Sequence, residues 1–250
     1  MKCVNVKYIA LSETGSVRTN NEDYYLVFKT KDDSFTLFLI ADGMGGHSAG
    51  EIASSFACKY VLEYLLVNLK RLNEIAEQVI REAYSYANQK IVELQMENPL
   101  WFGMGTTLAG VFVLKEKVII SNVGDSRVYF INQDKMLQIT EDHSLVYEMY
   151  KNGKITKEEI YTHPQKNIIT RAIGIGKEVD VDVYELKPQE LGERWYILLC
   201  TDGLTNMVSE SYIKEAFEKT SFEQIGKVLV EKALENGGID NITVLYFTTQ

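Results

Sequence analysis

Twice in this chain, a largely apolar run ends abruptly at an acidic residue followed by glycine. Phe35–Ala41 leads directly into Asp42-Gly43, and Trp195–Cys200 leads through Thr201 into Asp202-Gly203. Runs of this length and composition are typical of strands that are buried on both faces. Each run therefore places a carboxylate at the edge of a covered sheet, beside a glycine at which a ligand can approach the main chain. For any single Asp-Gly pair, an ordinary turn is the alternative interpretation.

The composition is that of a globular protein with a sizeable core. The chain has 250 residues, of which 46% are hydrophobic and 24% are charged, and its formal net charge is -9. The length fits one large domain or two small ones. Because no linker, repeat or low-complexity tract interrupts the sequence, we predict a single domain over residues 1–250. The negative charge repels phosphate backbones, so we expect no nucleic-acid partner.

The cysteines and the start of the chain indicate the cellular compartment. Cys3, Cys58 and Cys200 are odd in number and widely spaced, which disfavours a disulfide framework and a zinc knuckle. No basic region followed by an apolar core opens the sequence, and no apolar run has the length needed to cross a bilayer. We therefore expect a cytoplasmic protein with no membrane partner, and a monomer as the default oligomeric state.

The spacing of apolar residues predicts groups of strands separated by pairs of helices. Strands are expected over Val4–Leu11, Tyr24–Thr30, Phe35–Ala41, Thr106–Leu114, Val118–Val123, Val128–Ile131, Leu137–Thr140, Val179–Leu186, Trp195–Cys200 and Ile242–Thr248. Helices are expected from Gly50 onward and over about Asn73–Gln95, Glu210–Glu218 and Phe222–Asn236. Paired helices between strand groups favour an α+β fold, with a core of two sheets and helix pairs on its outer faces.

Three finer expectations follow from the same pattern. Thr106–Leu114, Val118–Val123 and Val128–Ile131 are expected to form one antiparallel meander. Glu141–Ala172 interrupts the strand pattern, so we predict that it forms a mobile flap. The apolar face of the helix that begins at Gly50 is expected to consist of Ile52, Ser55, Phe56, Tyr60 and Leu62.

Five acidic residues share a setting at strand boundaries: Asp23, Asp42, Asp125, Asp202 and Asp240. If they converge, two like charges about 4 Å apart cost about 4 kcal/mol at an effective dielectric near 20. Divalent cations would neutralise such a cluster, and ligands that are all oxygen favour magnesium or manganese over zinc. Two such ions would lower the pKa of a shared water and supply a nucleophile. The alternative is that these acids are separate turn formers or helix caps.

The motifs resemble those of the bacterial branch of the metal-dependent serine/threonine protein phosphatases, the PPM or type 2C family. The matching blocks occur in order along the whole chain: Gly15-x-x-Arg18-x-x-Asn21-Glu22-Asp23, Ala41-Asp42-Gly43-Met44-Gly45-Gly46-His47, Gly103-Met104-Gly105-Thr106-Thr107, Val123-Gly124-Asp125-Ser126-Arg127, Thr201-Asp202-Gly203-Leu204 and Asp240-Asn241-Ile242-Thr243. The flap also matches, from Glu141 to Val146 and from His163 to Ala172. The resemblance implies a β-sandwich of two antiparallel sheets flanked by helix pairs, in αββα layers, with a flap subdomain.

The resemblance also implies roles for the acids. Asp42 would bridge two Mg²⁺ or Mn²⁺ ions, with the Gly43 carbonyl and Glu22 at one ion and Asp202 and Asp240 at the other. Asp23 would orient water, and Asp125 would help to bind a third, weaker ion.

By the same resemblance, Arg18 would bind the phosphoryl oxygens of phosphoserine or phosphothreonine on a protein. A hydroxide that bridges the ions would attack phosphorus in line, so no phosphoenzyme would form. Animal members have a histidine where Met44 stands, which leaves His47 or metal-bound water as the general acid, and we favour a structural role for His47. His143 and His163 are expected to organise the flap.

Phosphorylated proteins, including a cognate serine/threonine kinase, are the partners that the resemblance implies, and the implied role is in signalling. A catalytically inactive relative that binds phosphopeptides or acts as a scaffold is the main alternative. A two-metal nuclease shares the ion chemistry, but the acidic charge and the lack of a basic stripe disfavour it.

Overall fold

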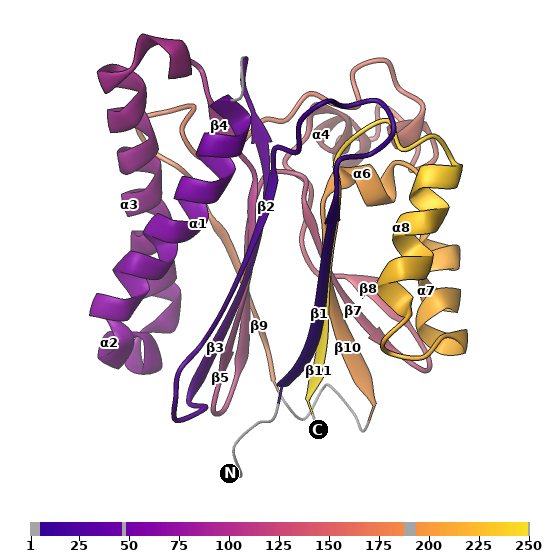
Figure 1. Cartoon of the computed structure of the whole chain (residues 1–250), viewed down its shortest axis with the longest axis horizontal. Coiled ribbons are helices and arrows are strands. Elements are labelled where there is room, and N and C mark those ends of the chain that lie inside the picture. Colours follow the sequence, from indigo (N-terminus) through magenta and orange to yellow (C-terminus); the bar gives the residue numbers. More distant parts are fainter. Residues whose placement is uncertain (1–5, 47–48, 188–193, 250) are drawn as a thin grey trace.

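The computed structural model describes residues 6–46, 49–187 and 194–249, in which two antiparallel sheets face each other (Figure 1). One sheet has the order β1-β11-β10-β7-β8, and these strands span Val6–Glu13, Ile242–Thr249, Trp195–Cys200, Arg127–Asn132 and Met136–Gln138. The other has the order β2-β3-β5-β6-β9, and its strands span Asp23–Lys29, Phe35–Met44, Leu108–Leu114, Val118–Val123 and Asp182–Leu186. The short strand β4 (Gly105–Thr106) pairs with β3.

Helices cover the outer face of each sheet. The β2–β9 sheet is covered by α1 (Ala49–Val67) and α3 (Ala76–Glu97), with the short α2 (Leu69–Glu74) between them (Figure 1). The other sheet is covered by α7 (Glu210–Lys219) and α8 (Ile225–Glu235). Shorter elements are α4 (Leu145–Lys151), α6 (Asp202–Thr205) and the 3-10 helices η1 (Pro99–Trp101) and η2 (Glu159–Tyr161). The predicted α+β sandwich with flanking helix pairs is confirmed.

The central strand β3 is buried on both faces because it contributes to two layers of the core. Leu37 and Leu39 contact the helix layer, whereas Phe38 and Ile40 lie between the sheets. The Phe38 ring stacks on Phe247 of β11, with 4.3 Å between the ring centroids. Strand β10 alternates in the same way, so both apolar runs that end in an acid are interior strands, as predicted.

The predicted single meander is wrong at its third strand. β5 and β6 pair with each other, but β6 and β7 belong to different sheets. The chain crosses from one sheet to the other at Gly124, which has a φ of +105°. A side chain does not fit at this position, because its Cβ would lie 2.6 Å from the Thr107 side chain. β6 and β7 are buried almost throughout, and neither alternates between polar and apolar residues, so their sequences could not tell which sheet each one joins.

The helices also depart from expectation. The helix expected over Asn73–Gln95 divides at Ile75 into α2 and α3. The predicted apolar face of α1 is wrong, because Ile52, Ser55, Phe56, Tyr60 and Leu62 are all only half-buried. The fully buried residues are small in the first half of the helix, from Ala49 to Cys58, and are followed by Val61 and Leu65. Small side chains allow the helix to lie close to the end of β3, a requirement that apolar spacing does not reveal. The helix α6 was not predicted.

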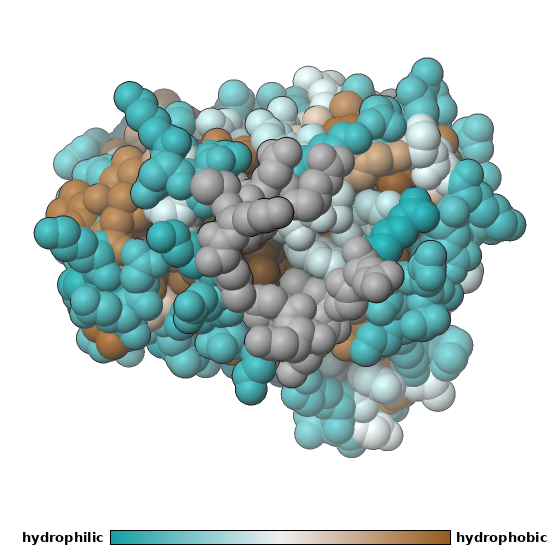
Figure 2. All heavy atoms as spheres, turned by 90° about the horizontal axis from the view of Figure 1, so that it is seen from below, coloured by the Kyte–Doolittle hydropathy of each residue, from teal (hydrophilic) through white to brown (hydrophobic). Residues whose placement is uncertain are grey.

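The ends of the sandwich differ. The end of β3, the β6–β7 loop, α4 and α6 gather at the end that is uppermost in Figure 1. The opposite end is seen in Figure 2, where hydrophilic residues predominate on the visible surface. Within the described ranges, no helix combines the length and apolarity needed to cross a bilayer. Cys58 and Cys200 are buried free thiols, and Cys3 lies outside the described residues.

Candidate metal centre

A cavity of about 260 Å³ lies at the upper end of the sandwich, between the two sheets. Its lining includes most of the predicted site residues: Arg18, Glu22, Asp42, Gly43, Asp125, Asp202 and Asp240. The first and last of these residues, Arg18 and Asp240, are more than two hundred positions apart in the sequence. They meet because the strands that carry or precede them end on the same side of the sandwich. The flap contributes Asn167 and Ile169 to the same cavity, which the sequence analysis did not predict.

Asp42 is fixed by the main chain around it. Its N–H donates to Thr107 Oγ1 at 2.9 Å, and its carbonyl accepts from Thr107 N at 2.9 Å and from Thr106 Oγ1 at 2.9 Å. The Thr107 hydroxyl also bonds the Ser126 hydroxyl at 2.8 Å, so the strand end that carries Asp42 is tied to the loop that carries Asp125.

Glu22 and Gly43 are hydrogen-bonded neighbours, and glycines at positions 43 and 50 allow α1 to pack closely against both. The Gly43 N–H donates to the Glu22 carbonyl at 3.1 Å, and the Glu22 N–H donates to Asn241 Oδ1 at 2.9 Å. A Cβ on Gly43 would lie 2.1 Å from the Gly50 carbonyl oxygen, and a Cβ on Gly50 would lie 2.7 Å from the Glu22 carboxyl carbon. The two glycines thus allow the start of α1 to lie against the end of β3 and the Glu22 carboxylate.

Asp23 lies behind the cavity, opposite Asp42 in the β2–β3 register. Its Oδ2 accepts from Thr201 Oγ1 at 2.9 Å and from Thr243 Oγ1 at 2.6 Å. Its Oδ1 is buried without a hydrogen-bond partner, as is Oδ1 of Asp202. No role was predicted for the two threonines, although both stand in motifs that carry the family resemblance, Thr201 directly before Asp202 and Thr243 three positions after Asp240.

Unsatisfied buried carboxylate oxygens fit a site for hard cations, which prefer oxygen ligands. Burial is the main cause that raises the pKa of Asp23, to about 7. Burial and the charges of neighbouring acids raise the pKa values of Asp42 and Asp125 well above the ordinary range, and burial also raises those of Asp202 and Glu22. A divalent cation would relieve the repulsion that these shifts reflect.

The carboxylates line the cavity, but they are not close enough together to form a complete coordination shell. Across residues 6–46, 49–187 and 194–249, no three His, Cys, Asp or Glu side chains already converge closely enough to hold an ion. Arg18 lies at the mouth with 51% of its side chain exposed, and its NH2 donates to Asp240 Oδ2 at 3.0 Å. The Asp240 charge raises the pKa of the Arg18 guanidinium.

The three histidines are not alike. His47 lies outside the described residues. His143 is buried and bonds the Gly124 backbone, and His163 Nδ1 accepts from the Gln165 N–H at 3.1 Å. Neither His143 nor His163 lines the cavity, and both bond main-chain groups at or beside the flap.

Comparisons with known proteins identify a family for the chain as a whole. The sequence profile of the family described as Protein phosphatase 2C matches residues 15–236. The chain is 39% identical over 236 residues to the serine/threonine phosphatase stp of Listeria welshimeri, which covers 94% of this chain and 92% of that relative. The solved serine/threonine phosphatase of S. agalactiae superposes with a TM-score of 0.88 at 34% identity, covering 98% of this chain and 100% of the other.

A further solved structure bears on the ions. The catalytic domain of the serine threonine protein phosphatase PstP, in complex with 2 manganese ions, superposes with a TM-score of 0.79 at 31% identity, over 98% of each chain.

Proposed function

The chain belongs to the protein phosphatase 2C family of metal-dependent serine/threonine phosphatases, and we propose that it hydrolyses phosphoserine and phosphothreonine on proteins with two divalent cations. The observation that carries this proposal is the meeting of Glu22, Asp42, Asp202 and Asp240 around one cavity, with Arg18 at its mouth.

The carboxylates divide between the two sides of the cavity. Asp42 would bind both ions, with Glu22 and the Gly43 carbonyl on one side and Asp202 and Asp240 on the other. When bound, Mn²⁺ or Mg²⁺ would supply a water of lowered pKa for in-line attack on phosphorus, without a phosphoenzyme. Asp125 would contribute to a third, weaker site.

Asp23 would act on that water from behind the cavity. Its Oδ2 is saturated by two threonine hydroxyls, so its carboxylate plane is fixed. Its Oδ1 has no partner and can accept a hydrogen bond from water. This acceptor would orient the attacking water by hydrogen bonding.

Arg18 would bind and orient the phosphoryl group. Its planar guanidinium can donate two parallel hydrogen bonds to phosphoryl oxygens. In the described structure its NH2 donates to Asp240 Oδ2 at 3.0 Å, and a cation at Asp240 would compete with the guanidinium for this carboxylate. Ion binding would weaken this contact and favour a turn of the guanidinium toward the substrate.

The substrates proposed here are phosphorylated proteins, including a cognate serine/threonine kinase, in the cytoplasm. The cavity is large enough for a phosphoryl group but not for a folded partner, so the rest of a substrate would lie across the rim and the flap. We propose that the chain acts as a monomer.

Hydrolysis of a phosphothreonine peptide in the presence of Mn²⁺ tests the proposal. We expect turnover by the wild type, a loss of several orders of magnitude in kcat for Asp202→Asn, and mainly a higher KM for Arg18→Ala. Wild-type turnover no greater than that of Asp202→Asn would contradict it. Calorimetric titration with Mn²⁺ then identifies the alternative, because an inactive phosphopeptide-binding relative need not bind two ions.

A further inference from the structure

The loop that carries Asp125 is bonded to a single buried histidine of the flap. The backbone N–H of Gly124 donates to the ring nitrogen Nδ1 of His143 at 3.0 Å. In return, the backbone N–H of His143 donates to the Gly124 carbonyl at 3.0 Å. Gly124 has a φ of +105°, a conformation that other residues resist, and its carbonyl also accepts from Asn122 Nδ2 at 3.0 Å. The Gly124 N–H has His143 Nδ1 as its partner, so the ring is what holds this side of the peptide. His143 is only 6% exposed. The ring therefore supports Asp125 from the Gly124 side, while the Ser126 hydroxyl supports it from the other side through Thr107.

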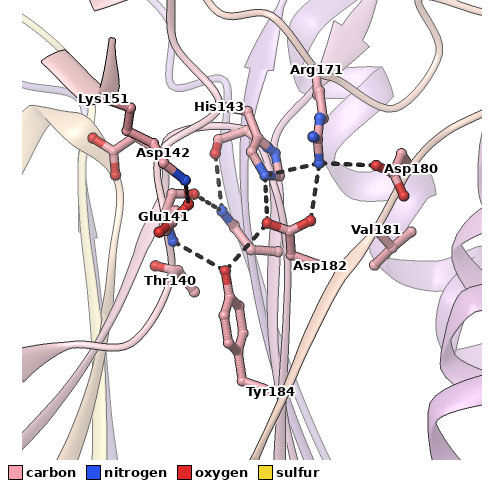
Figure 3. Close-up of polar contacts among 12 residues, drawn as sticks. Thr140, Glu141, Asp142, His143, Lys151, Arg171, Asp180, Val181, Asp182 and Tyr184 are labelled. Atoms are coloured by element: carbon pink, nitrogen blue, oxygen red, sulfur yellow. Dashed lines mark hydrogen bonds and ion pairs between the residues drawn. The ribbon is translucent and has the colours of Figure 1, made fainter. Parts of the chain in front are cut away.

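The hydrogen bonds determine which ring nitrogen carries the proton. A backbone N–H can only donate, so Nδ1 of His143 must accept, and the proton of the neutral ring is on Nε2. Nε2 lies 3.1 Å from Asp182 Oδ2 and donates to it. Arg171 NH1 lies 3.3 Å from the same nitrogen, but because Nε2 already carries a proton, Arg171 donates to Asp182 Oδ1 at 3.0 Å (Figure 3).

Asp182 thus collects donors from both ends of the flap. His143 lies at the start of the flap and Arg171 at its end, while Asp182 and Tyr184 belong to the edge strand β9 (Figure 3). The Tyr184 hydroxyl donates to Asp182 Oδ2 at 3.2 Å. The carboxylate fixes the ring of His143, much as an outer carboxylate fixes a metal-bound histidine in other proteins. Here the fixed nitrogen faces a backbone amide.

We propose that His143 is a positioning residue for Asp125, and that Asp182 sets its tautomer. The relay runs from Asp182 through the His143 ring to the Gly124 N–H, and it determines where the Asp125 carboxylate lies at the cavity. This inference rests on the proposed function, because Asp125 matters only if the cavity binds ions. If His143 only filled space beneath the flap, its effect would depend on the size of its side chain. It would then not matter which ring nitrogen accepts a hydrogen bond from Gly124.

Two substitutions separate these cases, because each keeps one half of the relay. His143→Asn places an amide oxygen near the position of Nδ1, so it can still accept from Gly124 but cannot reach Asp182. His143→Gln extends to the position of Nε2, so it can still donate to Asp182 but offers Gly124 no acceptor. His163→Gln, in the same flap but away from this loop, is the matched control.

The first readout uses the metal-free protein and needs no activity. We expect nitrogen NMR of the wild-type ring to place the proton on Nε2. We expect amide exchange at Gly124 to be at least about tenfold faster in His143→Gln than in the wild type, and close to the wild type in His143→Asn and His163→Gln. A proton on Nδ1, or equal exchange in the two His143 variants, would overturn the proposal.

The second readout is kcat and KM, measured at saturating Mn²⁺. We expect His143→Gln to lower kcat about tenfold with little change in KM, and His143→Asn to restore most of it. In an Asp125→Ala background His143→Gln should cause no further loss, because it acts through that carboxylate. Additive losses would contradict the relay. If the wild type has no phosphatase activity, the proposed function fails, whereas NMR and exchange still decide whether His143 holds Gly124.

Discussion

At the scale of single residues, the site is a set of acids that folding buries close together, where their charged forms are destabilised. Asp23 shows this most clearly, because its pKa is raised from 3.8 to about 7 by burial, against the opposing effect of the hydrogen bonds from Thr243 and Thr201. The folded chain therefore binds this proton more tightly than the unfolded chain does. Its contribution to stability is complete below about pH 3.8 and is lost as the pH rises toward about 7.

The first prediction is that the melting temperature of the metal-free protein falls as the pH rises from about 4 to about 7. Saturating Mn²⁺ should remove much of the fall, because a cation replaces the protons. Asp23→Asn should flatten the metal-free profile. Calorimetry at fixed ionic strength checks this, and a metal-free profile that rises across the window would speak against it.

The second prediction concerns Asp42, whose pKa is raised by burial and by the charges of Asp23 and Asp202. In the metal-free chain this carboxylate must either stay charged beside other acids or take up a proton, and Asp42→Asn removes that cost. We expect the metal-free variant to melt above the wild type at pH 7.5, by about 2–4 °C for each kcal/mol of repulsion removed. Turnover should fall by orders of magnitude. A variant that is both less stable and inactive would indicate a structural role instead.

At the scale of elements, the contact between the end of β3 and the start of α1 depends on glycines. A Cβ at Gly43 would lie 2.1 Å from the Gly50 carbonyl oxygen, whereas a Cβ at Gly46 would meet nothing within 4 Å. The same short turn therefore holds one glycine that the packing requires and one that it does not.

The third prediction uses this pair. Gly43→Ala should displace α1 from the carboxylate edge and lower the free energy of unfolding by about 2 kcal/mol or more, while Gly46→Ala should stay within about 0.5 kcal/mol of the wild type. Urea unfolding measures both. Equal effects of the two substitutions would show that the close approach at Gly43 is not required.

The elements also show how far the sequence could lead. Phe35–Ala41 and Trp195–Cys200 were predictable as interior strands because both of their faces are apolar. The change of sheet at Gly124 was not predictable, since β6 and β7 carry no polar alternation that would distinguish their partners. The division at Ile75 and the helix α6 depend on tertiary contacts, which periodicity does not describe.

At the scale of the whole molecule, the two-sheet sandwich is what brings Glu22, Asp42, Asp125, Asp202 and Asp240 to one cavity. The acids themselves could be named from the sequence, because strand boundaries and recurring motifs mark them. The supporting groups could not: Thr201 and Thr243 reach Asp23 only because β10 and β11 are neighbours, and His143 reaches Gly124 only through the fold.

The fourth prediction is the most direct test of the claim that these carboxylates bind a pair of divalent cations. Crystals soaked in Mn²⁺ would be measured for anomalous scattering at the manganese edge. The account predicts two strong peaks in the cavity, both adjacent to Asp42, one beside Glu22 and Gly43 and the other beside Asp202 and Asp240. A cavity without anomalous density at saturating Mn²⁺ would contradict it.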